Sequence, residues 1–216
     1  MNKATKQFIS EFVGTLLLVY IGAGSAMFFG TIGLVGVALA FGFIVTAVVY
    51  ALGNVSGAHI NPAVTISLLV AGKTTPSQAG LYIVAQVLGA IVAALLMSFT
   101  LASSGSGLGV TALGANVTPI QGLVTEALAT FILVLTVFGS AVGKGASNHA
   151  GLAIGMVVAG VILTTGVVTN TSINPARSIG PALIAGDFTN LWVYIVGPII
   201  GGVLAALLHQ VLDEGK

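Results

Sequence analysis

Two Asn-Pro-Ala motifs carry the most distinctive polar groups of this 216-residue chain. They are Asn61-Pro62-Ala63, within HINPAVT, and Asn174-Pro175-Ala176, within SINPARS. Asn is a favoured N-cap, and Pro fits the first helical position because the N–H that it lacks would find no partner there. Each motif therefore predicts the start of a short helix with an amide side chain at its tip. These amides can form hydrogen bonds, but the motifs supply no nucleophile.

Arg177 is the only arginine, and it follows Asn174 by three residues, which places both near one helical face. The corresponding residue of the first motif is Val64, so the two motifs are asymmetric. An ionisable side chain inside an apolar segment is presumed functional. The alternative is that Arg177 pairs with a buried glutamate.

The other polar residues argue against several function classes. The acids are few and scattered, and no His and Ser grouping or metal-ligand spacing occurs, so the sequence predicts no enzyme, metal or cofactor. Cysteine is absent, which excludes disulfides and thiol chemistry, and no basic cluster suggests nucleic acid. A coupled transporter would need ionisable groups at one midplane site. Glu11 and Glu126 are candidates, but nothing in the sequence places them in one lumen.

Composition places the motifs in a membrane protein. Only 5% of residues are charged, 56% are hydrophobic and the mean hydropathy is +1.13, which leaves too little charge to cover a soluble domain. The first apolar run is interpreted as a retained helix, not a cleaved signal, because it is nearly long enough to span and contains Glu11. At about 20 residues per span, six helices are predicted near 8–29, 34–52, 78–101, 120–141, 150–169 and 190–212.

Two further segments, 53–73 and 169–187, are too short to span and too apolar to be ordinary loops. These segments are predicted to enter the membrane and return to the side from which they entered. A helix of about ten residues is roughly 15 Å long, so two that meet end to end cover the approximately 30 Å hydrocarbon core. The irregular backbone before each motif is tolerable at that depth only if it is packed in protein or lines water. A polar path through the protein is the simplest interpretation.

The chain also repeats itself. EFVGTLLLVYIGAGSA from Glu11 matches EALATFILVLTVFGSA from Glu126, and Asn-Pro-Ala follows each about fifty residues later. Each half holds three spans, so the second half must be inverted in the membrane relative to the first. We predict a single domain, residues 1–216, with halves at about 1–105 and 118–216 joined by a Gly- and Ser-rich linker.

The lysines predict the orientation. With N- and C-termini in the cytoplasm, every lysine falls on the cytoplasmic side, and the opposite connections, near 30–33 and 102–119, carry no Lys or Arg. This topology also puts Arg177 toward the outer mouth. We expect an integral protein of the cell membrane. The lysines are Lys3, Lys6, Lys73, Lys144 and Lys216.

Two NPA motifs on duplicated halves that each open with glutamate resemble the aquaporin or major intrinsic protein family. The resemblance covers essentially the whole chain. It implies an all-α polytopic membrane protein, a right-handed bundle of six transmembrane helices plus two re-entrant half-helices in an inverted repeat. It also implies a pore in each protomer, assembly as a homotetramer, and water or small neutral solutes as the molecules that pass.

By this resemblance, Asn61 and Asn174 would point N–H donors into the lumen and bind the oxygen of a passing water. Such a water cannot both donate to and accept from its neighbours in file, which interrupts the path that protons would use, while the positive half-helix ends repel cations. The implied function is a passive transmembrane water channel that excludes protons and ions. The alternative is that both asparagines only cap helices.

The resemblance gives Glu11 and Glu126 the role of holding the re-entrant backbone so that its carbonyl groups face the pore. The alternative is interhelical hydrogen bonding with either acid protonated. The implied pore-lining carbonyls belong to Gly57, Ala58, His59, Thr171 and Ser172.

The family's constriction carries over to four positions, Phe41, Ile162, Thr171 and Arg177. Ile162 departs from the pattern, because water-selective members usually have histidine there. Glycerol facilitators have glycine there, and a tryptophan in place of Phe41. The combination is similar to that of archaeal-type aquaporins.

Further positions bear on whether the channel would pass water or glycerol. Ser178 stands where glycerol facilitators usually have aspartate and Ala182 where they have a basic residue, so both favour water. Tyr194 agrees, whereas Ile195 replaces a tryptophan common in water channels. We expect fast water flux with weak permeation by glycerol or another small neutral solute. The alternatives are a mixed glycerol and small-solute facilitator, and a non-transporting membrane-junction protein.

The three histidines carry weaker signals. His59 is either a pore-lining residue through its backbone or a hydrogen-bonded loop residue. His149, within KGASNHAG, is interpreted as a solvated loop histidine in preference to a pH gate. His209 carries no functional signal.

Overall fold

The computed structural model describes residues 1–103, 105, 107–142 and 147–213. Lys144 and Lys216, used above for the orientation, lie outside the described residues. Within these ranges, six helices are long and apolar enough to cross a membrane, which confirms the predicted fold class. The elements are α1 (Lys3–Leu18), a π-helical turn (Val19–Ala23), α2 (Gly24–Ala26), α3 (Phe29–Ser56), α4 (Pro62–Val70), α5 (Pro76–Thr100), a 3-10 turn (Gly107–Gly109), α6 (Pro119–Ala141), α7 (Ala150–Thr169), α8 (Pro175–Ala185) and α9 (Val193–Asp213).

The first two spans are longer than predicted. The first begins at Lys3, because Asn2 caps it by accepting from the Thr5 N–H at 2.8 Å, so the helix extends through polar residues that carry no apolar signal. The second continues to Ser56 and ends where Gly57 turns to φ 91°. Apolar periodicity locates a span, but capping residues set where it begins and ends.

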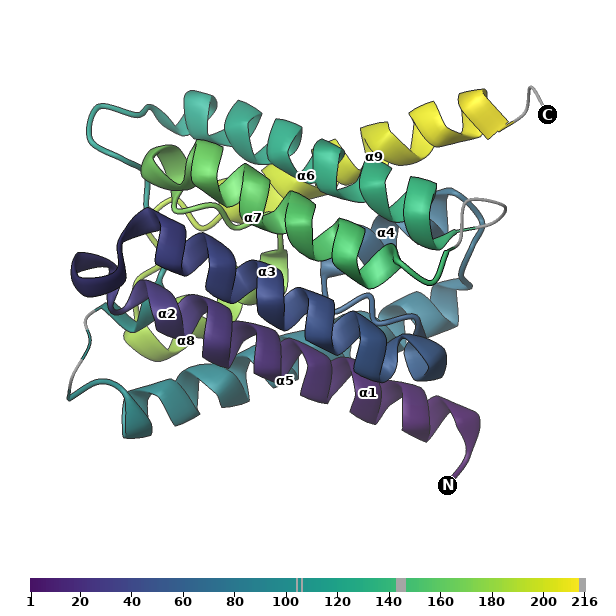
Figure 1. Cartoon of the computed structure of the whole chain (residues 1–216), viewed down its shortest axis with the longest axis horizontal. Coiled ribbons are helices and arrows are strands. Elements are labelled where there is room, and N and C mark those ends of the chain that lie inside the picture. Colours follow the sequence, from purple (N-terminus) through teal and green to yellow (C-terminus); the bar gives the residue numbers. More distant parts are fainter. Residues whose placement is uncertain (104, 106, 143–146, 214–216) are drawn as a thin grey trace.

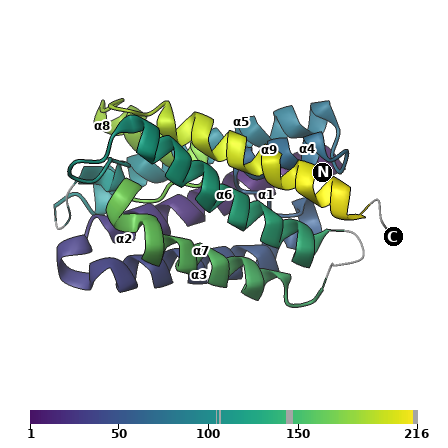
Figure 2. The same cartoon turned by 90° about the horizontal axis from the view of Figure 1, so that it is seen from above.

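The helices form one bundle with the two half-helices at opposite ends (Figure 1). α4 lies at the end of the bundle where α1 begins and α9 ends, and α8 lies at the other end. Within the halves, α1 packs on α3 and α5, and α6 packs on α7 and α9. The halves join where α3 lies along α7, as seen from above in Figure 2. Each half-helix also packs on the last helix of the other half, α4 on α9 and α8 on α5.

Two glycines show that the halves are built alike. A β-carbon at Gly89 of α5 would clash with the carbonyl oxygen of Phe12 in α1, and a β-carbon at Gly201 of α9 would clash with that of Ala127 in α6. Phe12 and Ala127 each follow the glutamate of their half. Small residues allow such close helix packing in membranes, and the matched contacts align α5 with α9.

Candidate functional site

Both half-helices begin at their Asn-Pro pair. Asn61 has an extended backbone, with φ −158°, and its Oδ1 accepts from the Ala63 N–H at 2.8 Å. Asn174 has φ −156°, and its Oδ1 accepts from Ala176 at 3.1 Å and Arg177 at 3.3 Å. Because each Oδ1 binds the end of its own helix, each Nδ2 faces away from it.

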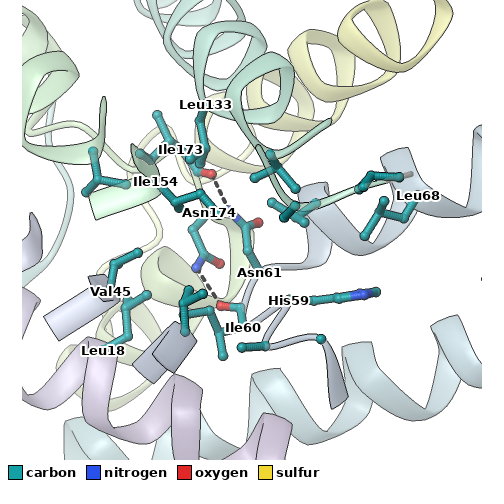
Figure 3. Close-up of a pocket in the computed structure, with 18 of the residues that line it drawn as sticks. Leu18, Val45, His59, Ile60, Asn61, Leu68, Leu133, Ile154, Ile173 and Asn174 are labelled. Carbon is teal, nitrogen blue, oxygen red and sulfur yellow. Dashed lines mark hydrogen bonds between the residues drawn. The ribbon is translucent and has the colours of Figure 1, made fainter. Parts of the chain in front are cut away.

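The two amides reach across to each other's loop (Figure 3). Asn61 Nδ2 donates to the Ile173 carbonyl at 2.7 Å, and Asn174 Nδ2 donates to the Ile60 carbonyl at 2.9 Å. An amide carries two N–H donors, and within the described residues each Nδ2 has one protein acceptor. The second N–H of each is available to a partner in the cavity that both side chains line.

Glu11 of α1 gathers donors from the chain before the first motif. Its Oε1 accepts from Ser56 Oγ at 2.6 Å and the His59 N–H at 2.9 Å. Its Oε2 accepts from the Ile60 N–H at 2.7 Å and Gln86 Nε2 at 2.8 Å. Glu11 thus binds the loop backbone and, through Gln86, also joins α1 to α5.

Glu126 of α6 repeats the arrangement with one donor fewer. Its Oε1 accepts from Thr169 Oγ1 at 2.7 Å and the Ser172 N–H at 2.9 Å. Its Oε2 accepts from the Ile173 N–H at 2.7 Å. Within the described residues, no side-chain hydrogen bond to Glu126 corresponds to the one that Gln86 donates to Glu11.

The loops reach these acids through alternating backbone conformations. Ala58 and Ile60 have φ of 47° and 45°, and Thr171 and Ile173 have φ of 43° and 48°. This left-handed region is unfavourable for residues with a side chain, and most of all for β-branched ones. The hydrogen bonds to the two glutamates stabilise it. The N–H groups turn toward the acids, while the loop residues line the cavity on their other side.

The cavity has a volume of about 360 Å³, and its lining extends to Lys73, just after α4, and to Ala141 and Val142 at the end of α6. Its polar side consists of Gly57, Ala58, His59, Ile60, Asn61, Ser172, Ile173 and Asn174, with the exposed Lys73 also in the lining. The facing wall is apolar and includes Leu18, Phe41, Val45, Val49, Val64, Leu133, Ile154 and Val158. A small polar molecule in this cavity can form hydrogen bonds on one side only.

Arg177 lies beside Phe41. The guanidinium carbon is 5.4 Å from the Phe41 ring centroid, a cation–π distance, and Nη1 donates to the Gly109 carbonyl at 2.6 Å. Arg177 is 1% exposed. The hydrogen bonds recorded for Glu126 do not include Arg177. The sequence did not point to Gly109, because a backbone carbonyl in a Gly-rich linker leaves no signal.

The other two residues predicted for the constriction lie apart from this contact. Thr171 Oγ1 is 2.7 Å from Thr165 Oγ1, which ties the second loop to α7. Ile162 is buried in α7 and lines a second hollow of about 300 Å³ together with Val37 and Gly166. The structure therefore brings Phe41 and Arg177 into contact, with Thr171 on the adjoining loop and Ile162 on α7.

Residues near the second motif form a separate group. Ser178 Oγ is 2.6 Å from Ser172 Oγ and accepts from Thr111 Oγ1 at 3.1 Å. Ala182 and Tyr194 are buried, and Ile195 is partly buried. The linker therefore contacts α8 through Thr111, in addition to its Gly109 contact with Arg177.

The histidine side chains lie away from the asparagine pair. The His59 ring packs edge-on against Tyr82 with centroids 4.9 Å apart, its Nδ1 is 3.2 Å from Thr65 Oγ1, and it points away from Asn61 (Figure 3). His149 is exposed at the start of α7. His209 stacks on Phe138 with ring centroids 4.4 Å apart, a contact that no sequence pattern indicates. Within the described ranges, no group of three or more His, Asp or Glu could hold a metal ion.

This architecture defines a class: a polytopic membrane protein in which two half-helices from opposite ends of the bundle meet beside an internal cavity, each with a capping asparagine that donates to the loop of the other. The family model described as Major intrinsic protein matches residues 1–209. Aquaporin AqpM of Methanothermobacter thermautotrophicus is 43% identical over 246 residues, covering 99% of this chain and 100% of that protein. Probable aquaporin TIP2-2 of Arabidopsis thaliana is 42% identical, covering 94% of this chain and 86% of that protein.

A solved structure is also similar. The X-ray structure of the aquaglyceroporin from Plasmodium falciparum has a TM-score of 0.84 and 26% sequence identity, with 98% of each chain covered. The chain belongs to the major intrinsic protein family.

Proposed function

We propose that this protein is a passive transmembrane water channel that excludes protons and ions. The observation that carries the proposal is the pair of asparagines, each with its Oδ1 bound to its helix end and one N–H bound to the opposite loop. A water that accepts from both remaining N–H groups turns its own hydrogens outward, so a proton cannot hop through it. The names of the similar aquaporins support the same function.

We further propose that Phe41, Ile162, Thr171 and Arg177 form the constriction, and that it admits water with weak passage of glycerol or another small neutral solute. The Arg177–Phe41 contact supports a narrow, charged opening. A mixed solute facilitator is the second candidate, because Ile162 supplies no polar wall and the similar solved structure is an aquaglyceroporin.

The carbonyl groups of Gly57, Ala58, His59, Thr171 and Ser172 are proposed to line the pore. Glu11 and Glu126 would hold them there through the N–H groups of the same loops. The support is the set of hydrogen bonds from residues 59, 60, 172 and 173 to the two acids.

The assembly and orientation are also proposals. We propose one channel domain, residues 1–216, with halves at about 1–105 and 118–216, in a homotetramer of the cell membrane with both termini cytoplasmic. Support comes from family membership and from the start of α1 and the end of α9 lying at one end of the bundle (Figure 1).

The test is a stopped-flow measurement on proteoliposomes, once with an impermeant osmolyte and once with glycerol, with empty liposomes as control. A companion measurement follows internal pH after an imposed proton gradient. We expect fast water efflux, slow glycerol entry and no proton leak. Asn61→Asp keeps the capping oxygen but removes both N–H donors, so water flux should fall and proton leak should rise. Unaccelerated water efflux in the folded wild-type protein would refute the channel function.

A further inference from the structure

The first span is not a regular α-helix along its whole length. The π-helical turn Val19–Ala23 separates α1 from α2, and the Gly24 N–H closes it by donating to the Val19 carbonyl. Such turns are rare and occur frequently at functional sites. The aligned residues of the second half, 134–138, lie inside α6, which is α-helical from Pro119 to Ala141. The two halves therefore differ in backbone at this place.

Gly22 of the π-helical turn lies directly against the Phe41 ring. A β-carbon at Gly22 would clash with the ring atoms Cδ1, Cε1 and Cζ of Phe41. Glycine, which has no β-carbon, lets the ring approach the backbone this closely. The same ring is in contact with the Arg177 guanidinium group. Gly22 thus sets how close to the first span the ring can lie, and with it the place of the ring beside Arg177.

The next residue of the turn contacts the other partner of Arg177. A β-carbon at Gly109 would clash with the Ala23 carbonyl oxygen, so the linker backbone lies directly on the turn. The Gly109 carbonyl accepts from Arg177 Nη1 at 2.6 Å. The aromatic ring and the carbonyl group that contact the guanidinium group therefore rest on adjacent residues of one π-helical turn.

The glycine, the ring and the arginine have aliphatic counterparts in the opposite halves, in register with the two glutamates and the two Asn-Pro-Ala motifs. The pairs are Gly22 with Val137, Phe41 with Ile154, and Arg177 with Val64. The three aliphatic residues all line the cavity. Where the guanidinium group is replaced by an aliphatic side chain, the ring and the glycine beneath it are replaced as well.

We propose that the π-helical turn Val19–Ala23 positions both groups that contact Arg177. Gly22 sets the place of the Phe41 ring, and Ala23 sets the place of the Gly109 carbonyl. Gly22 is then a specificity-determining positioning residue that acts through the ring. The effect on permeation rests on the proposed function, whereas the packing of the ring on Gly22 can be tested without any flux.

Gly22→Ala tests the first contact. The ring must retreat by about 1 Å to regain an ordinary carbon–carbon distance, and the open space that Phe41 lines is the cavity. We expect water permeability in proteoliposomes to fall about tenfold, equivalent to about 1.4 kcal/mol of barrier. Glycerol permeability should fall by at least the same factor. Unchanged permeability in a folded Gly22→Ala protein would overturn the role of Gly22.

Gly24→Ala is the matched control, since it makes the same change two residues further along. A β-carbon there would lie 3.1 Å from Leu101 Cδ1, the end of a flexible side chain, and does not meet Phe41. Both permeabilities should stay at the wild-type value. A fall equal to that of Gly22→Ala would mean that the position of the ring is not the cause.

Phe41→Leu provides a rescue that a merely structural role of Gly22 would not give. The leucine side chain is shorter than the ring, so the methyl group of Gly22→Ala finds room. Adding Gly22→Ala to Phe41→Leu should change neither permeability by more than about twofold, the range expected of residues that no longer interact. The same tenfold fall in both backgrounds would show that Gly22 does not act through the ring.

Gly109→Ala tests the second contact. The linker must move away from Ala23 and take with it the acceptor of Arg177 Nη1, so the ratio of glycerol to water permeability should rise about fivefold, the factor that one ordinary net hydrogen bond is worth. Gly107→Ala is the control. Its φ of 70° gives the same backbone strain as the 64° of Gly109, and no described atom beyond its chain neighbours lies within 4 Å of its β-carbon position. An equal rise in both variants would overturn the role of Ala23.

Thermal unfolding in detergent tests the packing independently of flux. Gly22→Ala should lower Tm in the wild-type protein and lower it less in Phe41→Leu. If Gly22→Ala does not fold, the double variant should fold, and its failure to fold where Phe41→Leu folds would overturn the proposal. A wild-type protein that passes no water would refute the proposed function, and the unfolding measurements would still test the place of the ring.

Discussion

The loops before the two Asn-Pro-Ala motifs share a backbone and differ in the side chains around it. Each places a left-handed residue one and three positions before its asparagine, sends two consecutive N–H groups to a buried glutamate, and ends in an asparagine that reaches the other loop. Gln86 donates to the glutamate of the first loop, and the described residues record no such donor for the glutamate of the second. Three residues after its asparagine, the first half has Val64 and the second has Arg177.

We expect this difference to separate the residues that support the loops from the residues that select the permeating molecule. The carboxyl group and the capping asparagine are needed wherever irregular backbone must persist inside a membrane, so they occur in both halves. The side chain three residues after the asparagine is free to differ, and only the second half places a charge there. We therefore expect changes at shared residues to affect both folding and flux, and changes at the differing residues to affect mainly selectivity.

The largest effect is expected from Glu11→Gln and Glu126→Gln. Each replaces an accepting oxygen with an NH₂ group that faces N–H donors, which should cost about 3 kcal/mol and reduce flux or folding. Glu11→Gln should be worse, because Glu11 accepts four hydrogen bonds and Glu126 accepts three. Thermal unfolding in detergent and stopped-flow flux measure this.

The exposed Asp187→Asn is the control for this pair, since it makes the same chemical change outside the spans. A stable Glu126→Gln protein with full flux would contradict the loop-holding role.

Arg177→Val tests selection by making the second half resemble the first. Removing the guanidinium group that lies against Phe41 should widen the opening, so glycerol permeability should rise relative to water by about tenfold, equivalent to about 1.4 kcal/mol of barrier. Lys6→Gln removes an exposed positive charge near the N-terminus and serves as control. An unchanged ratio would mean that the constriction lies elsewhere.

Gln86→Met should have a smaller effect and tests the comparison from the other side. It removes the fourth donor of Glu11, which makes the first half resemble the second, at a cost of about 1–2 kcal/mol in stability. The permeability ratio should stay constant, because the position beside this loop is Val64. A shift in the ratio would show that support and selection are not separate here.

His149 should have the smallest effect. Its ring is exposed at the start of α7, and the hydrogen bond recorded there is from its backbone N–H to Ser147 Oγ at 3.2 Å. Water permeability should be the same in His149→Ala and the wild-type protein between about pH 5 and pH 8. A pH-dependent flux that the substitution abolishes would restore the gate hypothesis.

Much of the fold followed from the sequence, because hydropathy, motif and repeat are local signals. Six spans and two half-helices that begin at Asn61 and Asn174 are confirmed. The helix ends were less predictable, since Asn2 and Gly57 set them by capping, without any change in apolar pattern.

The site was predictable only in part. Residue types and motif spacing pointed to Glu11, Glu126, Asn61, Asn174 and Arg177, and their roles stay predictions. The contacts around them could not be foreseen, because the Gly109 carbonyl comes from a linker, and the contact of Phe41 with Gly22 depends on how α3 packs against the π-helical turn.

The crossed asparagine hydrogen bonds have a consequence for the order of synthesis. Asn61 donates to a carbonyl that lies 112 residues further along the chain, and Asn174 donates back across 114. When the first half leaves the ribosome, its central amide has no permanent acceptor, and its left-handed loop is held from one side only. The lumen can therefore be completed only in the last stage of biogenesis, when residue 173 docks.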